Sequence, residues 1–144
     1  MKKNILLLTF TGMLFSLLTF SACKKDDVDS TKPEIVINEP EEEEQFAPGS
    51  ELHLDVDFTD NEYLNQYKVD IHSAEGHIHK STAEKWVFEQ TYDLGGLKNK
   101  HVHEHIDIPA TIDTGDYHIV VYCTDKAGNE NNAFKTFEVK IAGK

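Results

Sequence analysis

From residue 33 onward, apolar and polar side chains alternate with a period of two, the pattern of half-buried β-strands. In the clearest stretch, residues 51–59, one parity is apolar and the other polar: Leu52, Leu54, Val56 and Phe58 against His53, Asp55 and Asp57. Glycine, proline and asparagine separate such stretches, and none has the 3.6-residue period of a helix. We therefore predict strands over residues 34–38, 51–59, 66–72, 85–94, 101–108, 117–124 and 134–141.

Seven one-sided strands without a helix predict two antiparallel sheets packed face to face, because each strand has one apolar face to bury. The expected fold is an immunoglobulin-like antiparallel β-sandwich of about seven strands, occupying residues 33–144. The four acidic residues 41–44 are expected in a loop, as a solvated charge run. Cys123 falls within an alternating apolar stretch, which indicates a buried core residue and not a nucleophile.

The first 32 residues have a different character. Two lysines precede an almost continuous apolar run over residues 5–20, which ends in Ser21-Ala22-Cys23, and this is typical of a secretory signal. The small residues directly before a cysteine resemble a bacterial lipobox. We expect residues 1–22 to be a removed lipoprotein signal peptide, Cys23 to be the lipidated N-terminus, and residues 23–32 to be a flexible tether. A membrane-spanning helix, the alternative, would need a longer apolar run.

The tether begins Lys24-Lys25-Asp26-Asp27, which resembles the surface-export signal of Bacteroidetes lipoproteins. The resemblance implies a protein held in the outer membrane by its lipid anchor and exposed at the cell surface; the periplasmic face is the alternative. All 14 basic residues are lysines, against 26 acids, for a net charge of −12. An acidic chain without arginine is not expected to bind nucleic acid, because phosphate contacts need clustered cations.

Histidine is the most informative residue type, with eight copies, all within the predicted domain. His101, His103 and His105 are spaced i, i+2 and i+4, so on a strand they project from one face, about 6.5–7 Å apart between successive Cα atoms. In an immunoglobulin-like topology, His72 and His118 become cross-strand neighbours, with His77 and His79 in the loop that follows His72. His53 is expected to point outward at the same end.

These eight histidines are the candidate ligands of a metal site: His53, His72, His77, His79, His101, His103, His105 and His118. Neutral imidazole suits Zn(II) and Cu(II). Both methionines lie before Cys23, so a sulfur-based Cu(I) site is not expected. Carboxylates near the histidines are candidate oxygen ligands or partners of the imidazoles: Asp55, Asp57, Glu104 and Asp107. Whether the histidines form one site or two depends on strand register and stays open.

Two functions follow. The first is an envelope lipoprotein that binds Zn or Cu(II) for capture, or for handover to an outer-membrane transporter. The second is a non-catalytic immunoglobulin-like module that docks on an envelope protein or a glycan. We expect no enzymatic activity and no organic cofactor, because no serine lies in a nucleophile motif and short loops leave little room for a cleft.

Two resemblances support this interpretation. Residues 115–129 resemble the last strand pair of bacterial immunoglobulin-like domains, in which a tyrosine opens one strand and an Asp-x-x-Gly-Asn turn leads to the next. The resemblance implies that Asp125 and Asn129 form a turn and do not bind calcium. The histidine-bearing segments 76–79, 101–109 and 115–118 resemble the Bacteroidetes lipoprotein family known as domain of unknown function 4625. That family implies a location and a fold over most of residues 33–141, but no activity.

Overall fold

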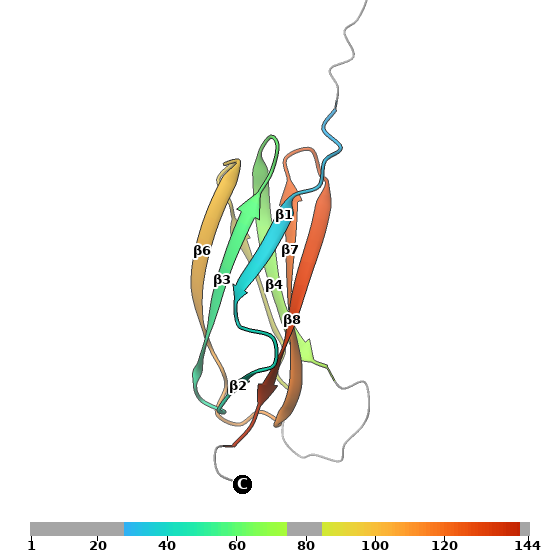
Figure 1. Cartoon of the computed structure of the whole chain (residues 1–144). Coiled ribbons are helices and arrows are strands. Elements are labelled where there is room, and N and C mark those ends of the chain that lie inside the picture. The colour runs from blue at the N-terminus through green and yellow to red at the C-terminus, as the bar shows by residue number, and fades with distance from the viewer. Residues whose placement is uncertain (1–27, 75–84, 142–144) are drawn as a thin grey trace, which may run out of the picture.

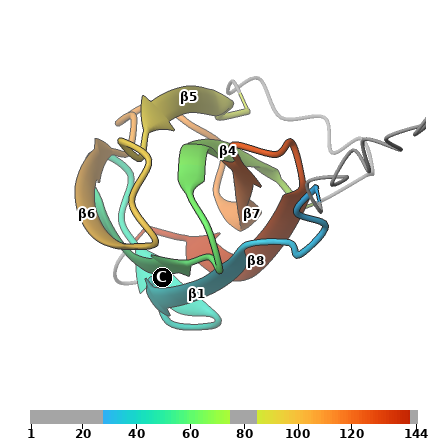
Figure 2. The same ribbon diagram turned by 90° about the horizontal axis from the view of Figure 1, so that it is seen from above.

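The computed structural model describes residues 28–74 and 85–141, which form two sheets packed face to face (Figures 1 and 2). One sheet has the order β1 (Glu34–Glu39), β3 (Glu51–Thr59) and β6 (Asn99–Asp107). The other has the order β2 (Glu44–Phe46), β8 (Glu130–Val139), β7 (Gly115–Asp125), β4 (Leu64–Ser73) and β5 (Phe88–Asp93). All pairs are antiparallel except β2 with β8. The predicted immunoglobulin-like β-sandwich is confirmed.

The described residues contain eight strands, one more than predicted. The additional strand is β2, which begins at Glu44, the last residue of the acidic run that we expected to be only a loop, and it pairs in parallel with β8. Its pairing runs from Glu44 opposite Phe137 to Phe46 opposite Val139. Three residues are too few to show a period of two, so the pattern could not predict this strand. β8 also begins at Glu130, four residues earlier than expected, because its pairing with β7 continues up to the turn.

The core lies between the sheets and consists of the apolar parity of each strand. The strands β3, β4 and β7 supply most of its fully buried side chains: Leu52, Leu54, Val56, Phe58, Tyr67, Val69, Ile71, Ile119 and Val121. Cys123 is fully buried among them, and burial, followed by the nearby charges of Asp60 and Asp125, raises the pKa of its thiol to about 12. The expected core role of Cys123 is confirmed, because a protonated, buried thiol is not a nucleophile.

Several predicted features lie outside the described residues. They are the signal peptide, Cys23, the run 24–27, and the two loop histidines His77 and His79. Within residues 28–74 and 85–141, no helix has the length and hydropathy that a membrane crossing requires.

Tyr117 provides a test of the fold. Its ring is buried against Trp86 and Phe137, and its hydroxyl donates a 2.9 Å hydrogen bond to the carbonyl oxygen of Asp113. Replacing Tyr117 with phenylalanine keeps the packing and removes the hydrogen bond, so we expect a loss of about 1 kcal/mol in the free energy of unfolding. Urea denaturation measures this loss. Tyr122→Phe, which alters a half-exposed ring on the same strand, is the control and should cost clearly less.

Candidate metal centre

The pairing of β3 with β6 builds a polar column on the outer face of the three-stranded sheet. Nine consecutive pairs join the two strands, from Glu51 opposite Asp107 to Thr59 opposite Asn99. Pairs that face the core alternate with pairs that face solvent, and side chains in directly opposite positions lie close together. The successive outward pairs are His53 with His105, Asp55 with His103, and Asp57 with His101. The predicted outward projection of His101, His103 and His105 is therefore confirmed.

At one end of this column, Glu51 joins two imidazoles. Its Oε1 atom lies 2.7 Å from Nδ1 of His105 and 3.1 Å from Nε2 of His53. One ligand atom from each of the three residues lies within 4.8 Å of the other two, and all three side chains are exposed. The ring of His103 is also close, with centroid distances of 5.5 Å to His53 and 5.0 Å to His105. Three potential ligands therefore converge, and a third imidazole lies beside them.

The rest of the column holds imidazoles between carboxylates. Asp55 Oδ2 lies 3.3 Å from Nδ1 of His103 and 3.3 Å from Nε2 of His101, and Asp57 Oδ1 lies 3.0 Å from Nδ1 of His101. The side-chain amide of Asn38 on β1 donates 2.9 Å hydrogen bonds to both aspartates. Such contacts orient imidazole rings and determine which ring nitrogen carries the proton. Of the two roles that the sequence left open for Asp55 and Asp57, oxygen ligand or imidazole partner, these contacts match the second.

Hydrogen bonds hold these carboxylates in the charged form. The contact with His105, then that with His53, lowers the pKa of Glu51. For Asp55 and Asp57, the amide of Asn38 is the largest cause of a lowered pKa, and the neighbouring histidines add to it. The face therefore presents ionised oxygen ligands next to nitrogen ligands.

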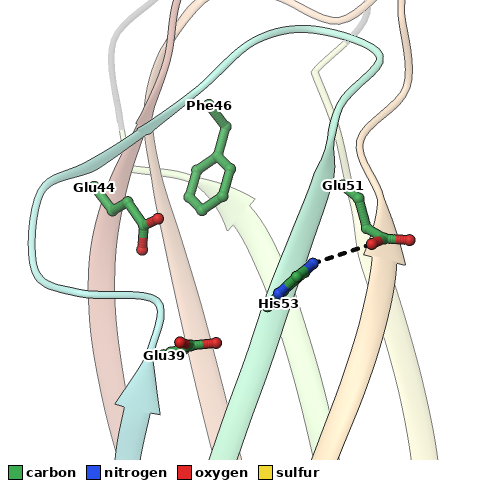
Figure 3. A pocket seen from close by; sticks show the side chains of 5 residues that line it. All are labelled: Glu39, Glu44, Phe46, Glu51 and His53. Atoms are coloured by element: carbon green, nitrogen blue, oxygen red, sulfur yellow. Dashed lines mark hydrogen bonds and ion pairs between the residues drawn. The ribbon is translucent and has the colours of Figure 1, made fainter.

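A shallow hollow of about 190 Å³ lies beside the Glu51 group, lined by Glu39, Glu44, Phe46, Glu51 and His53. Figure 3 shows the ring of His53 between Glu51 on one side and the carboxylates of Glu39 and Glu44 on the other. The hollow has room for an ion with several waters, each of which occupies about 30 Å³ in the liquid. It is smaller than the roughly 300 Å³ at which small-molecule sites begin. The acidic lining favours a cation.

Two details of the predicted ligand set are corrected. Glu104 was a candidate oxygen ligand or imidazole partner, but it lies on the opposite parity of β6, where it accepts a 2.8 Å hydrogen bond from the buried hydroxyl of Tyr67. Burial and this hydrogen bond raise the pKa of Tyr67. Glu51 was not predicted as a ligand, although its i, i+2 spacing from His53 was a signal for it. Its contact with His105 depends on cross-strand register, which the sequence alone does not supply.

The remaining described histidines lie on the other sheet. His72 is opposite His118 in the pairing of β4 with β7, as predicted, and their rings stack with centroids 5.8 Å apart. Nδ1 of His72 lies 2.8 Å from Oδ1 of Asp70. These two histidines lie on the outer face of the five-stranded sheet, whereas His53 and His105 lie on the outer face of the three-stranded sheet. All four histidines lie toward the end of the sandwich where β3 and β7 begin, as expected, but the two pairs are on opposite outer faces and do not form one group.

The contacts of Glu51 predict a measurable dependence of its pKa on His105. In the wild-type protein this pKa is below its usual value of 4.5, so the stabilisation it provides is present above pH 4.5 and is lost as the pH falls through the lowered value. Replacing His105 with alanine removes the largest cause, and we expect the pKa of Glu51 to rise toward 4.5. Carboxyl ¹³C NMR titration measures the change. In His118→Ala, on the other sheet, the Glu51 pKa should stay at its wild-type value.

Comparisons with known proteins agree with this fold. Among solved structures, OgpA from Akkermansia muciniphila superposes with a TM-score of 0.52 at 14% identity, covering 76% of this chain and 30% of OgpA. Spo0M, a sporulation control protein from Bacillus subtilis, superposes with a TM-score of 0.52 at 8% identity, covering 76% of this chain and 49% of Spo0M. The chain therefore spans less than half of either protein, and at such identities the likeness concerns the fold alone.

No curated protein matches the sequence. A family model does match, over residues 21–142, which include the predicted lipidation position and the whole sandwich. This confirms the resemblance drawn from the histidine-bearing segments, as far as the family itself is concerned. The chain belongs to the family described as domain of unknown function DUF4625.

Proposed function

We propose that this protein is an envelope lipoprotein that binds a divalent transition metal, Zn²⁺ or Cu²⁺, through Glu51, His53 and His105. The observation that carries the proposal is the convergence of these three ligand atoms within 4.8 Å on the face of a regular sheet. Two of the residues are on β3 and one on β6, so backbone pairing holds them in place without any loop. Little additional ordering is needed when a metal binds.

The ligand types favour a transition metal. Two nitrogens and one oxygen suit Zn²⁺ or Cu²⁺, whereas Ca²⁺ and Mg²⁺ take oxygen ligands. Three protein ligands leave a position for water or for a fourth ligand, and His103 is the nearest imidazole that can supply it. Asp55, in contact with His103, supplies the carboxylate partner that metal-binding histidines usually have.

The exposure of the ligands favours exchange over permanent storage. Glu51, His53 and His105 all lie at the surface, where a donor or acceptor protein can reach the ion. A lipid on Cys23 would hold such a site near an outer-membrane transporter, and the Lys24–Asp27 run would direct it to the cell surface. We assign this site a binding role and not a catalytic one, because the adjoining hollow is too small for most substrates.

The metal proposal predicts stoichiometric binding by the full chain, purified in mild detergent without a histidine tag. Isothermal titration with Zn²⁺ and with Cu²⁺ should show one site that weakens as the pH falls, because imidazole must lose its proton to bind. Glu51→Gln and His105→Ala should each weaken binding by more than about tenfold, since even outer-shell changes commonly cost that much.

His72→Ala and His118→Ala are matched controls, because they remove imidazoles from the other sheet and should leave the affinity unchanged. Circular dichroism of each variant checks that the sandwich is intact. Equal losses in all four variants would mean that the metal binds nonspecifically to surface histidines, and unchanged affinity in Glu51→Gln and His105→Ala would exclude the proposed ligands.

The lipoprotein part of the proposal has its own test. In cells that process lipoproteins, Cys23→Ser should abolish incorporation of labelled fatty acid and move the protein from the membrane fraction to the soluble fraction. Ser21→Ala, which keeps a small residue before the cysteine, is the control and should be lipidated normally. Fatty-acid labelling that persists in Cys23→Ser would place the anchor elsewhere.

An interaction module is the second candidate, and a feature of the five-stranded sheet favours it. Phe134 on β8 is 59% exposed, and its ring lies 5.7 Å from that of His118, which in turn stacks on His72. Exposed aromatic rings of this kind are common where proteins contact other proteins or glycans. The titration separates the candidates, because a pure docking module would bind no metal through Glu51.

A further inference from the structure

Three aspartates from separate parts of the chain meet at the end of the sandwich where β3 and β7 finish. Asp29 precedes β1, Asp60 directly follows β3, and Asp125 is the last residue of β7. Figure 1 shows that the segment leading into β1 reaches the sandwich beside the β7–β8 connection, at the end where β3 also turns into β4. One carboxylate oxygen from each aspartate lies within 4.8 Å of the other two.

Two of these carboxylates are buried. Asp60 is 7% exposed and Asp125 is 2% exposed, while Asp29 is half-buried. Oδ2 of Asp60 accepts a 2.8 Å hydrogen bond from the backbone of Glu62, but its Oδ1 is buried and has no hydrogen-bond partner. Oδ2 of Asp29 is also buried and has no hydrogen-bond partner. Buried carboxylate oxygens without partners are rare, because losing hydration without compensation costs several kcal/mol.

No cation of the described chain compensates these charges. Among residues 28–74 and 85–141, no lysine or histidine nitrogen lies within 4.0 Å of the three carboxylates. The nearby lysines have other partners: Lys98 donates to the carbonyl oxygen of Asn61, and the ammonium group of Lys126 lies 5.8 Å from the centre of the Tyr63 ring. The site therefore concentrates negative charge in a largely buried place without a direct ion pair within the described residues.

The remaining oxygens of the group are held in fixed positions. The backbone and side-chain amides of Asn129 donate hydrogen bonds of 2.8 and 2.7 Å to the two oxygens of Asp125. The amide of Asn61 and the backbone of Thr31 each donate a 3.0 Å hydrogen bond to Oδ1 of Asp29. Each Asp125 oxygen accepts one hydrogen bond and so keeps a lone pair for a cation, and Oδ2 of Asp29 accepts none. The group is thus ordered before any ion arrives.

We propose that Asp29, Asp60 and Asp125 bind a calcium ion. Oxygen ligands alone select a hard cation, and Ca²⁺ accepts irregular sets of six to eight oxygens, with water completing the shell, whereas Mg²⁺ requires a near-octahedral arrangement. Asp125 and Asn129 do form the turn that the sequence predicted. The proposal adds a ligand role for Asp125, contrary to the resemblance to bacterial immunoglobulin-like domains, which implied a turn former that does not bind calcium.

Calcium at this position would join three segments that are distant in sequence. It would fasten the residues before β1 to the β3–β4 and β7–β8 connections and so fix the direction in which the chain enters the domain. The site lies seven residues along β3 from His53, which corresponds to about 23 Å. At that separation the two metal sites are expected to act independently.

The test is a calcium titration of the full chain in mild detergent, after treatment with a chelator and its removal. Calorimetry should show one Ca²⁺ per chain, with Mg²⁺ binding more weakly. Calcium at 100 times its dissociation constant should raise the melting temperature by about 10 °C, since ligand that binds only the folded state stabilises it. Asp60→Asn, which preserves shape and removes one charge, should abolish the calcium-dependent rise while melting without calcium at or above the wild-type temperature.

Asp116→Asn is the matched control, because it removes one charge from an exposed position at the other end of β7 and should keep the full calcium response. Glu51→Gln should also keep the full calcium response, and Asp60→Asn should keep wild-type Zn²⁺ binding. The calcium proposal and the transition-metal proposal can therefore fail independently of each other. Absence of calcium heat and of a melting shift in the wild type would overturn the proposal. A wild-type calcium response in Asp60→Asn would overturn it as well.

Discussion

The antiparallel pairing of β3 with β6 joins nine residue pairs, and its register determines both the core and the candidate metal face. In this register Leu52 lies opposite Ile106 and faces the core, whereas the adjacent pair, His53 with His105, faces solvent. A shift of one residue would bury the imidazoles and expose the apolar side chains, which hydrophobic burial strongly disfavours. The free energy that holds the ligands in position therefore comes from the core side of the same two strands.

The correct predictions from the sequence followed from the alternation of apolar and polar residues along each strand. It placed His101, His103 and His105 on one outward face, and the expected topology made His72 and His118 neighbours. Alternation does not say which side chains meet across strands. The contact of Glu51 with His105, 54 residues apart, and the inward position of Glu104 beside Tyr67 both depend on three-dimensional packing. The strand β2 escaped prediction because it is short and pairs with residues more than 90 positions away.

The three aspartates of the proposed calcium site also show that the sequence does not reveal which side chains meet in the folded chain. In the sequence, Asp29 belongs to the acidic segment 26–29 within the predicted tether, whereas Asp60 and Asp125 are single aspartates next to turns, for which a turn-forming role is the ordinary expectation. Asp125 fulfils that role with Asn129. Only the folded structure brings the three carboxylates together and leaves oxygens of Asp29 and Asp60 buried without donors. A run of acids such as residues 41–44 is conspicuous in sequence, yet this less visible group carries the stronger physical demand for a cation.

The two groups differ in ways that separate their roles. On the three-stranded sheet the carboxylates have donors in Asn38 and the histidines, and the ligands are exposed, so the face is satisfied without an ion and can gain or lose one at little structural cost. At the other end of β3, burial leaves charge uncompensated, so an ion there would act as part of the fold. If both proposals hold, nitrogen ligands would select a transition metal at the first site, and oxygen ligands would select calcium at the second. Since the β-sandwich fold is compatible with many functions, these local differences in donors and burial are the basis for assigning one site to exchange and the other to stability.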